Sequence, residues 1–341
     1  MKKVFAILLA LSMLLAMTAC GGNAPETTAP SVPETTAPVE TTAPVAAEPV
    51  DVMVLNGTTG FGMANLMDAA ANGAAAQAYT FSVETDASNI VAALVNGSVD
   101  IAALPTNAAA AVYNKTQGGV QVLALNTLGV LYLVTDGSVE INSMADLAGQ
   151  TVYAPAQNPS FIFQHIVQAN GLTDVTIDNT YAQPADLNAA VASGQVSIAV
   201  LPEPMVTVAK SKNPELQVAL DLTAEWDKVS AEGSLVQGCV VVRKEFAQAN
   251  PQAIALFLEE YGASIQTMLD DIEGTAAKIE ANGIFTKAAV AAKAIPNCNV
   301  CFITGAEMKT ALEAFMSTMF EVAPASVGGS IPGEDFYYIS E

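Results

Sequence analysis

Hydrophobic positions along the chain follow two different periods in turn. Short apolar runs are followed by turns that contain Gly or Pro, and then by apolar positions at helical spacing. The helix expected at 88–95 has Ser88 as its N-cap and stops at Gly97. Strands are expected at 51–55, 79–83, 99–104, 120–125 and 131–135. This alternation predicts an α/β fold with a mainly parallel sheet.

The same strand and helix pattern occurs a second time in the chain. Residues 89–105 match residues 186–202, with a Gly and a Pro at corresponding positions, and residues 51–67 have a counterpart at 150–167. Chance similarity between two common strand–helix units is one explanation. The shared Gly and Pro favour another, which is two similar α/β domains facing each other across a cleft. The period is too long for a solenoid.

The C-terminal part of the chain does not begin a third copy. A strand expected at 238–243 is followed by long amphipathic helices at 251–269 and 306–320, whose Met residues we expect to fill the core. We expect this tail to pack on the first domain, so that the chain crosses twice between the domains and forms a two-strand hinge. The predicted domains are 51–130 with 238–341, and 131–237.

The N-terminus has the pattern of a targeting signal. Lys2 and Lys3 precede an apolar run over 4–19, which is typical of a signal peptide and is short for a membrane-spanning helix. The run ends Met17-Thr18-Ala19-Cys20, which resembles a bacterial lipobox. Residues 1–20 are therefore expected to be a lipoprotein signal peptide, with Cys20 as the lipidated residue. Ordinary secretory cleavage, with Cys20 incidental, is the alternative.

A Pro-rich segment separates this signal from the folded part. Residues 21–50 contain three near-repeats of Glu-Thr-Thr-Ala-Pro, which predict a disordered linker because such a segment cannot bury enough surface to fold. Signal and linker together predict an extracytoplasmic bacterial protein that is held at the cell membrane by an acyl chain on Cys20 in the lipid bilayer.

Composition excludes several classes of protein. The 341 residues include 34 Asp and Glu but only 12 Lys and Arg, which gives a formal net charge of −22. Nucleic-acid-binding proteins and polybasic membrane-surface proteins need a basic surface, which this charge excludes. The chain has one His and lacks Gly-x-Ser-x-Gly, His-Glu-x-x-His and Walker motifs, which disfavours an enzyme. We expect no cofactor.

Candidate ligand-binding residues follow from the expected fold. In open α/β sheets, ligands bind beyond the carboxyl ends of the strands, which selects the loops 56–61, 105–107, 155–160 and 202–204. Helices that begin at these loops offer free N–H groups and a positive dipole end, and the glycines allow close approach of backbone to ligand. The candidate residues are Gly57, Thr58, Thr59, Gly60, Thr106, Asn107, Gln157, Asn158, Ser160 and Glu203.

The charge of these loops indicates a class of ligand. They contain one carboxylate, Glu203, and no Lys or Arg, whereas a strongly anionic ligand usually recruits Arg. We therefore expect a neutral or partly cationic polar ligand, such as a nitrogen heterocycle whose N–H groups Glu203 accepts. The alternative is that Glu203 only stabilises a helix start. His165, Trp226 and Tyr153 are expected in the core, with contact to the ligand as the alternative.

Three cysteines remain after Cys20. The Cys298-Asn-Val-Cys301 motif has flanks typical of a turn and a strand, whereas redox motifs open a helix. A zinc site would need a fourth ligand besides three Cys, and only the distant His165 is available, so we expect no metal. The remaining alternatives are a Cys239–Cys298 disulfide or buried thiols.

Taken together, these features resemble the solute-binding proteins of ABC importers, in the class for nitrate, sulfonates, taurine and thiamine precursors. The resemblance is carried by Cys20 and by residues 145–152, 161–172, 200–204, 238–246 and 327–332. It implies a type II periplasmic binding fold, with two similar doubly wound domains, a two-strand hinge and an interdomain cleft. It also implies a monomeric Venus-flytrap receptor that delivers a small molecule to a permease and ATPase complex. The alternative is an enzyme on the same fold, related to thiamine-pyrimidine synthases, whose Cys-rich cluster this chain lacks.

Overall fold

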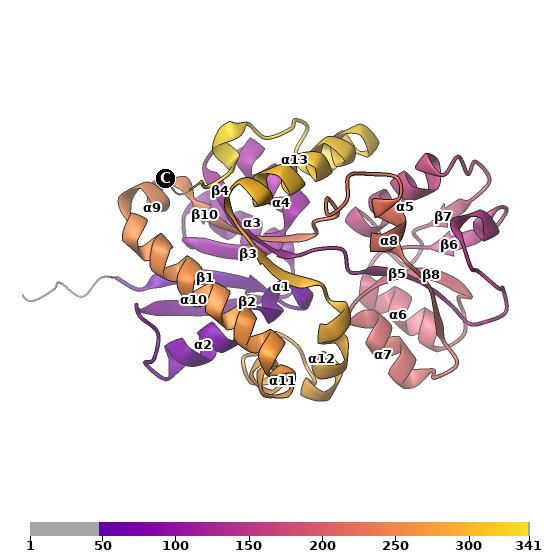
Figure 1. Cartoon of the computed structure of the whole chain (residues 1–341), viewed down its shortest axis with the longest axis horizontal. Coiled ribbons are helices and arrows are strands. Elements are labelled where there is room, and N and C mark those ends of the chain that lie inside the picture. The colour runs from indigo at the N-terminus through magenta and orange to yellow at the C-terminus, as the bar shows by residue number, and fades with distance from the viewer. Residues whose placement is uncertain (1–47, 340–341) are drawn as a thin grey trace, which may run out of the picture. The chain divides into compact units, whose positions relative to one another are not determined.

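The computed structural model describes residues 48–339 of the chain (Figure 1). The predicted signal peptide, Cys20 and most of the 21–50 linker lie outside the described residues. The first strand begins at Val50, the last residue assigned to the linker. No helix in the described part is long and apolar enough to cross a membrane.

A six-stranded sheet is built from two separate parts of the chain. Its order is β11-β4-β10-β3-β1-β2. Its strands are β1 (Val50–Leu55), β2 (Tyr79–Glu84), β3 (Ile101–Pro105), β4 (Val120–Thr127), β10 (Gly238–Arg243) and β11 (Val300–Ile303). β1 pairs in parallel with β2 and β3, whereas β10 is antiparallel to β3 and β4, and β11 is antiparallel to β4.

A five-stranded sheet takes the intervening residues, in the order β7-β6-β8-β5-β9. Its strands are β5 (Leu131–Thr135), β6 (Thr151–Tyr153), β7 (Thr176–Asp178), β8 (Ile198–Pro202) and β9 (Gln217–Asp221). β6 is parallel to β7 and β8, and β5 is antiparallel to β8 and β9. Both sheets are therefore mixed, and the expectation of a mainly parallel sheet is wrong. The chain reaches β5 from the six-stranded sheet and returns to β10 from the five-stranded sheet. Neither strand therefore follows the helical crossover that connects parallel neighbours in one sheet.

Helices cover both faces of both sheets. The helices that precede β10 are α1 (Thr58–Phe61), α2 (Ala64–Ala71), α3 (Ala87–Asn96), α4 (Thr106–Lys115), α5 (Asn158–Ala169), α6 (Pro184–Ala192), α7 (Met205–Lys212) and α8 (Leu222–Asp227). Those that follow are α9 (Lys244–Ala249), α10 (Pro251–Asp270), α11 (Ile272–Ala281), α12 (Ala288–Ala294) and α13 (Gly305–Val322). Short 3₁₀ helices are Met144–Leu147, Ile295–Asn297, Pro324–Val327 and Glu334–Phe336.

The start of α3 differs from the sequence-based expectation by two residues. Its N-cap is Asp86, whose Oδ1 accepts a hydrogen bond from Ser88 N at 2.8 Å, and not Ser88 itself. Both residue types cap helices, and Asp86 is the one in the extended conformation that a cap needs. The helix ends as expected at Gly97, with φ at +77°.

The core divides along the faces of the six-stranded sheet. One apolar cluster lies under α3, α4 and α13 and continues to α5 and α8 of the five-stranded sheet, and another lies under α2, α10, α11 and α12 (Figure 1). A third cluster packs α6 and α7 on the other face of the five-stranded sheet. Side chains alternate between the first two clusters along β10, so Cys239 and Val241 face one and Val240 and Val242 the other.

This alternation decides between the two alternatives for the cysteines. Cys239 belongs to the α13 cluster and Cys298 to the α10 cluster, and both are buried free thiols. The predicted Cys239–Cys298 disulfide is therefore not formed, because the two side chains lie on opposite faces of the sheet. Burial raises the pKa of the Cys239 and Cys298 thiols. It also raises the pKa of the free Cys301 thiol, to about 12.

Candidate functional site

The strand ends of the two sheets enclose a cavity. We call residues 50–127 and 238–339, around the six-stranded sheet, the first lobe, and residues 131–227, around the five-stranded sheet, the second lobe. Both belong to one compact unit, Ala47–Glu341. The first cavity, of about 440 Å³, is lined by residues that follow β1, β2, β3 and β8, by the starts of α5 and α6, and by Phe285 after α11. The carboxyl ends of strands thus form the site, as the loop rule predicts.

Five of the ten candidate residues line this cavity. They are Gly57, Thr58, Thr59, Asn158 and Glu203. At Gly57, φ is +86° and nothing lies within 4 Å of a Cβ position, so the backbone is open to the cavity. Gly57 N donates to Ile284 O at 3.0 Å, which ties this turn to the segment that carries Phe285.

Three candidates, Gly60, Thr106 and Ser160, are not among the residues that line this cavity. A Cβ on Gly60 would lie 2.8 Å from Ile284 Cγ2 and would also strike the Leu55 carbonyl, so this glycine serves packing against β1. Thr106 is fully buried and donates to Val236 O at 2.7 Å. Ser160 is buried beside Asn179, whose Nδ2 donates to its hydroxyl at 3.1 Å.

The remaining two candidates, Asn107 and Gln157, line a different cavity. It has a volume of about 490 Å³ and lies between the start of α5 and the helices α3 and α4. The structure therefore divides the single predicted cleft into two neighbouring spaces.

A direct hydrogen bond joins the lobes at the first cavity. Thr58 Oγ1, at the start of α1, donates to the carbonyl oxygen of Glu203 at 2.9 Å, and it lies 3.8 Å from Cys298 Sγ. Thr58 and Glu203 are both buried, so this bond is shielded from water. It is a contact between the loop after β1 and the loop after β8.

The carboxylate of Glu203 has its own partners. It accepts hydrogen bonds from Thr207 N at 3.1 Å and from Thr207 Oγ1 at 3.0 Å, in the first turn of α7. Burial raises the pKa of Glu203, while the hydrogen bonds from Thr207 oppose that shift. These contacts are those of a residue that stabilises a helix start, which was the alternative interpretation.

The electrostatics of the first cavity follow from its lining. The lining residues include no Lys, Arg or His, and their one carboxylate is directed to α7. Side chains that can hydrogen-bond come from Asn56, Thr59, Gln183 and Gln237, and apolar contact comes from Phe285, Met205 and several prolines. Such a lining can hold a compact polar molecule of no large net charge.

The aromatic and imidazole candidates contribute to packing. His165 Nε2 lies 2.7 Å from Ser230 Oγ, its ring packs on Trp226 at 4.8 Å between centroids, and burial lowers its pKa. Trp226 is fully buried, with Nε1 donating to Ser234 Oγ at 2.9 Å. Neither lines the cavities at the lobe junction. Within residues 48–339 there is no group of three His, Cys, Asp or Glu side chains that could hold a metal ion.

Phe285 and Gln237 are among the lining residues that sequence reasoning missed. Phe285 follows α11 rather than a strand and reaches the cavity because Ile284 O accepts the hydrogen bond from Gly57 N. Gln237 lies in the second hinge segment, where its N donates to Thr127 O and its Oε1 accepts from Val130 N at 2.8 Å. A rule that hinge segments line the cleft would have found Gln237, whereas no local signal marks Phe285.

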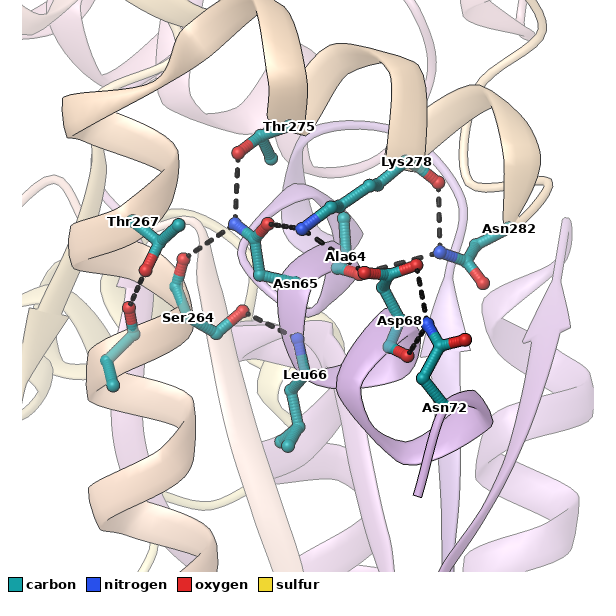
Figure 2. Close-up of polar contacts among 11 residues, drawn as sticks. Ala64, Asn65, Leu66, Asp68, Asn72, Ser264, Thr267, Thr275, Lys278 and Asn282 are labelled. Atoms are coloured by element: carbon teal, nitrogen blue, oxygen red, sulfur yellow. Dashed lines mark hydrogen bonds and ion pairs between the residues drawn. The ribbon is translucent and has the colours of Figure 1, made fainter. Parts of the chain in front are cut away.

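A buried polar network fixes the helix that follows the Gly57 turn. Figure 2 shows Asn65 of α2 between α10 and α11, where its Nδ2 donates to Thr275 Oγ1 at 2.9 Å and its Oδ1 accepts from Lys278 Nζ at 3.0 Å. Ser264 accepts from Leu66 N at 3.1 Å, and Lys278 pairs with Asp68 at 3.2 Å. The network holds α2 on α11, and α11 leads directly to Phe285 in the cavity wall.

Comparison with solved structures shows the fold. An ABC transporter protein from Parabacteroides distasonis has 22% identity and a TM-score of 0.73, covering 86% of this chain and 99% of that one. The periplasmic aliphatic sulphonate binding protein SsuA from Escherichia coli has 15% identity and a TM-score of 0.67, covering 83% and 96%. The alkanesulfonate-binding protein SsuA from Xanthomonas axonopodis pv. citri, bound to MOPS, has 15% identity and a TM-score of 0.60, covering 84% and 96%.

These likenesses establish the α/β architecture of periplasmic binding proteins, with two sheets and helices on their faces. No curated protein matches the chain in sequence. A family model does match, over residues 49–295, which include both sheets except β11 and all the residues that line the first cavity. The chain therefore belongs to the family described as the substrate-binding domain of ABC-type glycine betaine transport systems.

Proposed function

We propose that this substrate-binding protein captures a small polar solute in the first cavity and delivers it, chemically unchanged, to the permease and ATPase complex of an ABC importer. The observation that carries the proposal is the cavity of about 440 Å³ at the strand ends, with walls from both lobes. A volume in this range accommodates one small molecule. A solute that contacts both lobes favours the arrangement in which they are close, and the permease can recognise that arrangement.

The solute that this lining supports is polar and carries no strong negative charge. A sulfonate would normally recruit Arg, and the lining residues include neither Arg nor Lys. A quaternary ammonium such as glycine betaine is normally held by several aromatic faces, and Phe285 is the only aromatic residue in the lining. A nitrogen heterocycle fits better, because its ring atoms can pair with the amides of Gln183 and Gln237 and its face can pack on Phe285.

We also propose that the protein acts as a lipid-anchored monomer outside the cytoplasm. The support is the lipobox-like sequence that ends at Cys20 and the Pro-rich spacer that follows it. One acyl chain binds a membrane only weakly, so we expect more than one chain on Cys20. Mass spectrometry of the membrane fraction should find an acylated N-terminal Cys20 peptide, and Cys20→Ala should move the protein to the soluble fraction. An unmodified N-terminus in the membrane fraction would contradict the anchor.

A thermal-shift screen of the purified chain tests the receptor function. The panel is thiamine precursors, flavins, amino acids, glycine betaine, alkanesulfonates and nitrate. Ala185→Trp fills the cavity at the start of α6, and Ala189→Trp is the matched control, because it is exposed on the same helix and does not line the cavity. We expect one nitrogen heterocycle to raise the Tm of the native chain and of Ala189→Trp, and not that of Ala185→Trp. Equal stabilisation of both variants would contradict binding in this cavity.

A further inference from the structure

The second cavity, of about 490 Å³, adjoins the first. Its walls are α3, α4 and the 3₁₀ helix Pro324–Val327 of the first lobe, and the start of α5 of the second lobe. Three segments contribute to both cavities. Thr85, Pro105 and Asn158 line the first, and Asp86, Asn107 and Gln157 line the second. The two cavities thus adjoin each other, with single stretches of backbone between them.

The second cavity has an apolar floor and one charged residue. Val91, Ala108 and Phe161 form part of the floor, and Asp86 is the only ionisable residue among those that line it. Hydrogen bonds from Ser88 lower the pKa of the Asp86 carboxyl, so this group is ionised at neutral pH. The lining includes no Lys, Arg or His to neutralise it.

Two polar groups in the same wall lack partners. Asn107 Oδ1 and Ser326 Oγ are buried and have no hydrogen-bond partner among the described residues. Buried polar atoms are almost always paired, and an unpaired one destabilises the structure around it. The amide of Asn107 turns about a soft torsion and can present its oxygen to the cavity, where a donor would satisfy it.

The two cavities differ in their carboxylates rather than in their helix starts. The starts of α5 and α6 line the first cavity, and the starts of α3 and α4 line the second, so positive helix ends face both. The carboxylate of Glu203 in the first cavity is buried and accepts hydrogen bonds from Thr207. Asp86 in the second cavity is exposed, and its Oδ1 accepts a hydrogen bond from Ser88 N, so the second cavity is the one that offers a solvent-accessible negative charge to a cationic donor.

We propose that the second cavity is a subsite for an amine group at one end of the solute, while the acceptor-bearing head of the same solute lies in the first cavity. Asp86, Asn107 and Ser326 receive the N–H groups, and the apolar floor packs against the aliphatic part next to the amine. This inference rests on the proposed receptor function and adds a chemical class to its solute, which is an elongated molecule with an amine tail.

Thiol labelling tests the subsite in the solute-free protein. Cysteine is placed in the second cavity by Ala108→Cys and in the first by Thr59→Cys. Each variant reacts with 2-aminoethyl methanethiosulfonate, a cation, and with 2-sulfonatoethyl methanethiosulfonate, an anion. Peptide mass spectrometry measures the rate at which each reagent labels the introduced Cys. The ratio of cation to anion rates, normalised to a small thiol in solution, should be about tenfold higher at Ala108→Cys than at Thr59→Cys, since a nearby charge concentrates its counterion.

Asp86→Asn is the matched control for this ratio. Asn caps a helix as well as Asp does, so α3 keeps its N-terminus while the cavity loses its charge. In this background the ratio at Ala108→Cys should fall to that at Thr59→Cys. Equal ratios in the two cavities, or a ratio that Asp86→Asn leaves unchanged, would overturn the subsite.

Small fragments give an independent reading of occupancy. Butylamine at concentrations in the roughly millimolar range expected for a fragment of this size should slow labelling at Ala108→Cys and leave Thr59→Cys unaffected. Butyrate should protect neither. Protection of Ala108→Cys by butyrate, or none by butylamine, would contradict an amine subsite. Both labelling experiments are done without the solute. A negative result would therefore overturn the subsite alone, whereas the thermal-shift screen tests the receptor function.

Discussion

The hydrogen bond between Thr58 Oγ1 and the Glu203 carbonyl should stabilise the closed arrangement of the lobes. Its two ends belong to different lobes, and both residues are buried. Thr58→Val removes the hydroxyl and keeps the shape of the side chain. It leaves the buried Glu203 carbonyl without this donor, which should destabilise the closed arrangement by about 1–3 kcal/mol. That destabilisation corresponds to a shift of roughly 5- to 150-fold in the equilibrium towards the open arrangement.

The equilibrium between the open and closed arrangements can be measured by electron–electron distance measurements between two spin labels, one in each lobe. Val95 on α3 and Val218 on β9 are exposed positions, one in each lobe, to which labels can be attached through introduced cysteines in a Cys20→Ser background. Cys239 and Cys298 are buried, and the pKa of all three native thiols in the described part is raised, so these thiols label slowly.

Thr59→Val is the matched control, because Thr59 lines the same cavity and its hydroxyl has no hydrogen bond among those of the described residues. We expect Thr58→Val to add a population with longer distances and Thr59→Val to leave the distribution as in the native chain. If Thr58→Val lowers the free energy of unfolding but leaves the distances unchanged, the bond does not govern closure and the reasoning fails.

Further predictions concern packing, titration and thiol chemistry. Gly60→Ala should lower the free energy of unfolding by about 1–3 kcal/mol through overpacking, because the new Cβ would lie 2.8 Å from Ile284 Cγ2. Gly57→Ala should lower it by about 1–3 kcal/mol, because φ of +86° with ψ of −158° is a backbone conformation that almost only Gly adopts. Both are measured by urea denaturation, and an unchanged free energy of unfolding in Gly60→Ala would contradict the contact with Ile284. Because burial raises the pKa of Glu203, the free energy of unfolding falls as pH rises from the ordinary Glu value of about 4.3 through the raised value. Glu203→Gln removes this titration, so the variant should be at least as stable as the native chain at pH 7 and should lose less free energy of unfolding between pH 4 and pH 7. A larger loss in the variant than in the native chain would refute this. Cys239 and Cys298 should react with a disulfide reagent only in denaturant, and a Cys239–Cys298 peptide in non-reducing mapping would show that the assignment of free thiols is wrong.

The elements with the strongest periodicity could be predicted from the sequence. The strand expected at 238–243 is β10, and the helices expected at 251–269 and 306–320 are α10 and α13 to within two residues at each end. In these segments the apolar spacing itself decides which face is buried, and Phe257 and Phe315 lie in the core. The antiparallel direction of β5 and β10 could not be predicted, because local periodicity does not specify the pairing partner.

The candidate site was predictable where it depends on strand ends alone. The turn after β1 and the start of α5 gave Gly57, Thr59 and Asn158 in the cavity wall. Gly60 was misassigned because a glycine that permits close packing on Leu55 has the same sequence signal as one that admits a ligand. Phe285 was missed because its place depends on how α11 docks through the buried network around Asn65, which only the tertiary structure shows.

The central claim is that one solute binds between the lobes and leaves unchanged. Isothermal titration calorimetry with the compound that most raises the Tm in the thermal-shift screen tests it most directly, followed by mass spectrometry of the recovered compound. We expect one site per chain, retained in Ala189→Trp, abolished in Ala185→Trp, and a recovered compound of unaltered mass. Undiminished binding to Ala185→Trp, or recovery of a chemically altered compound, would contradict a solute receptor with this cavity as its site.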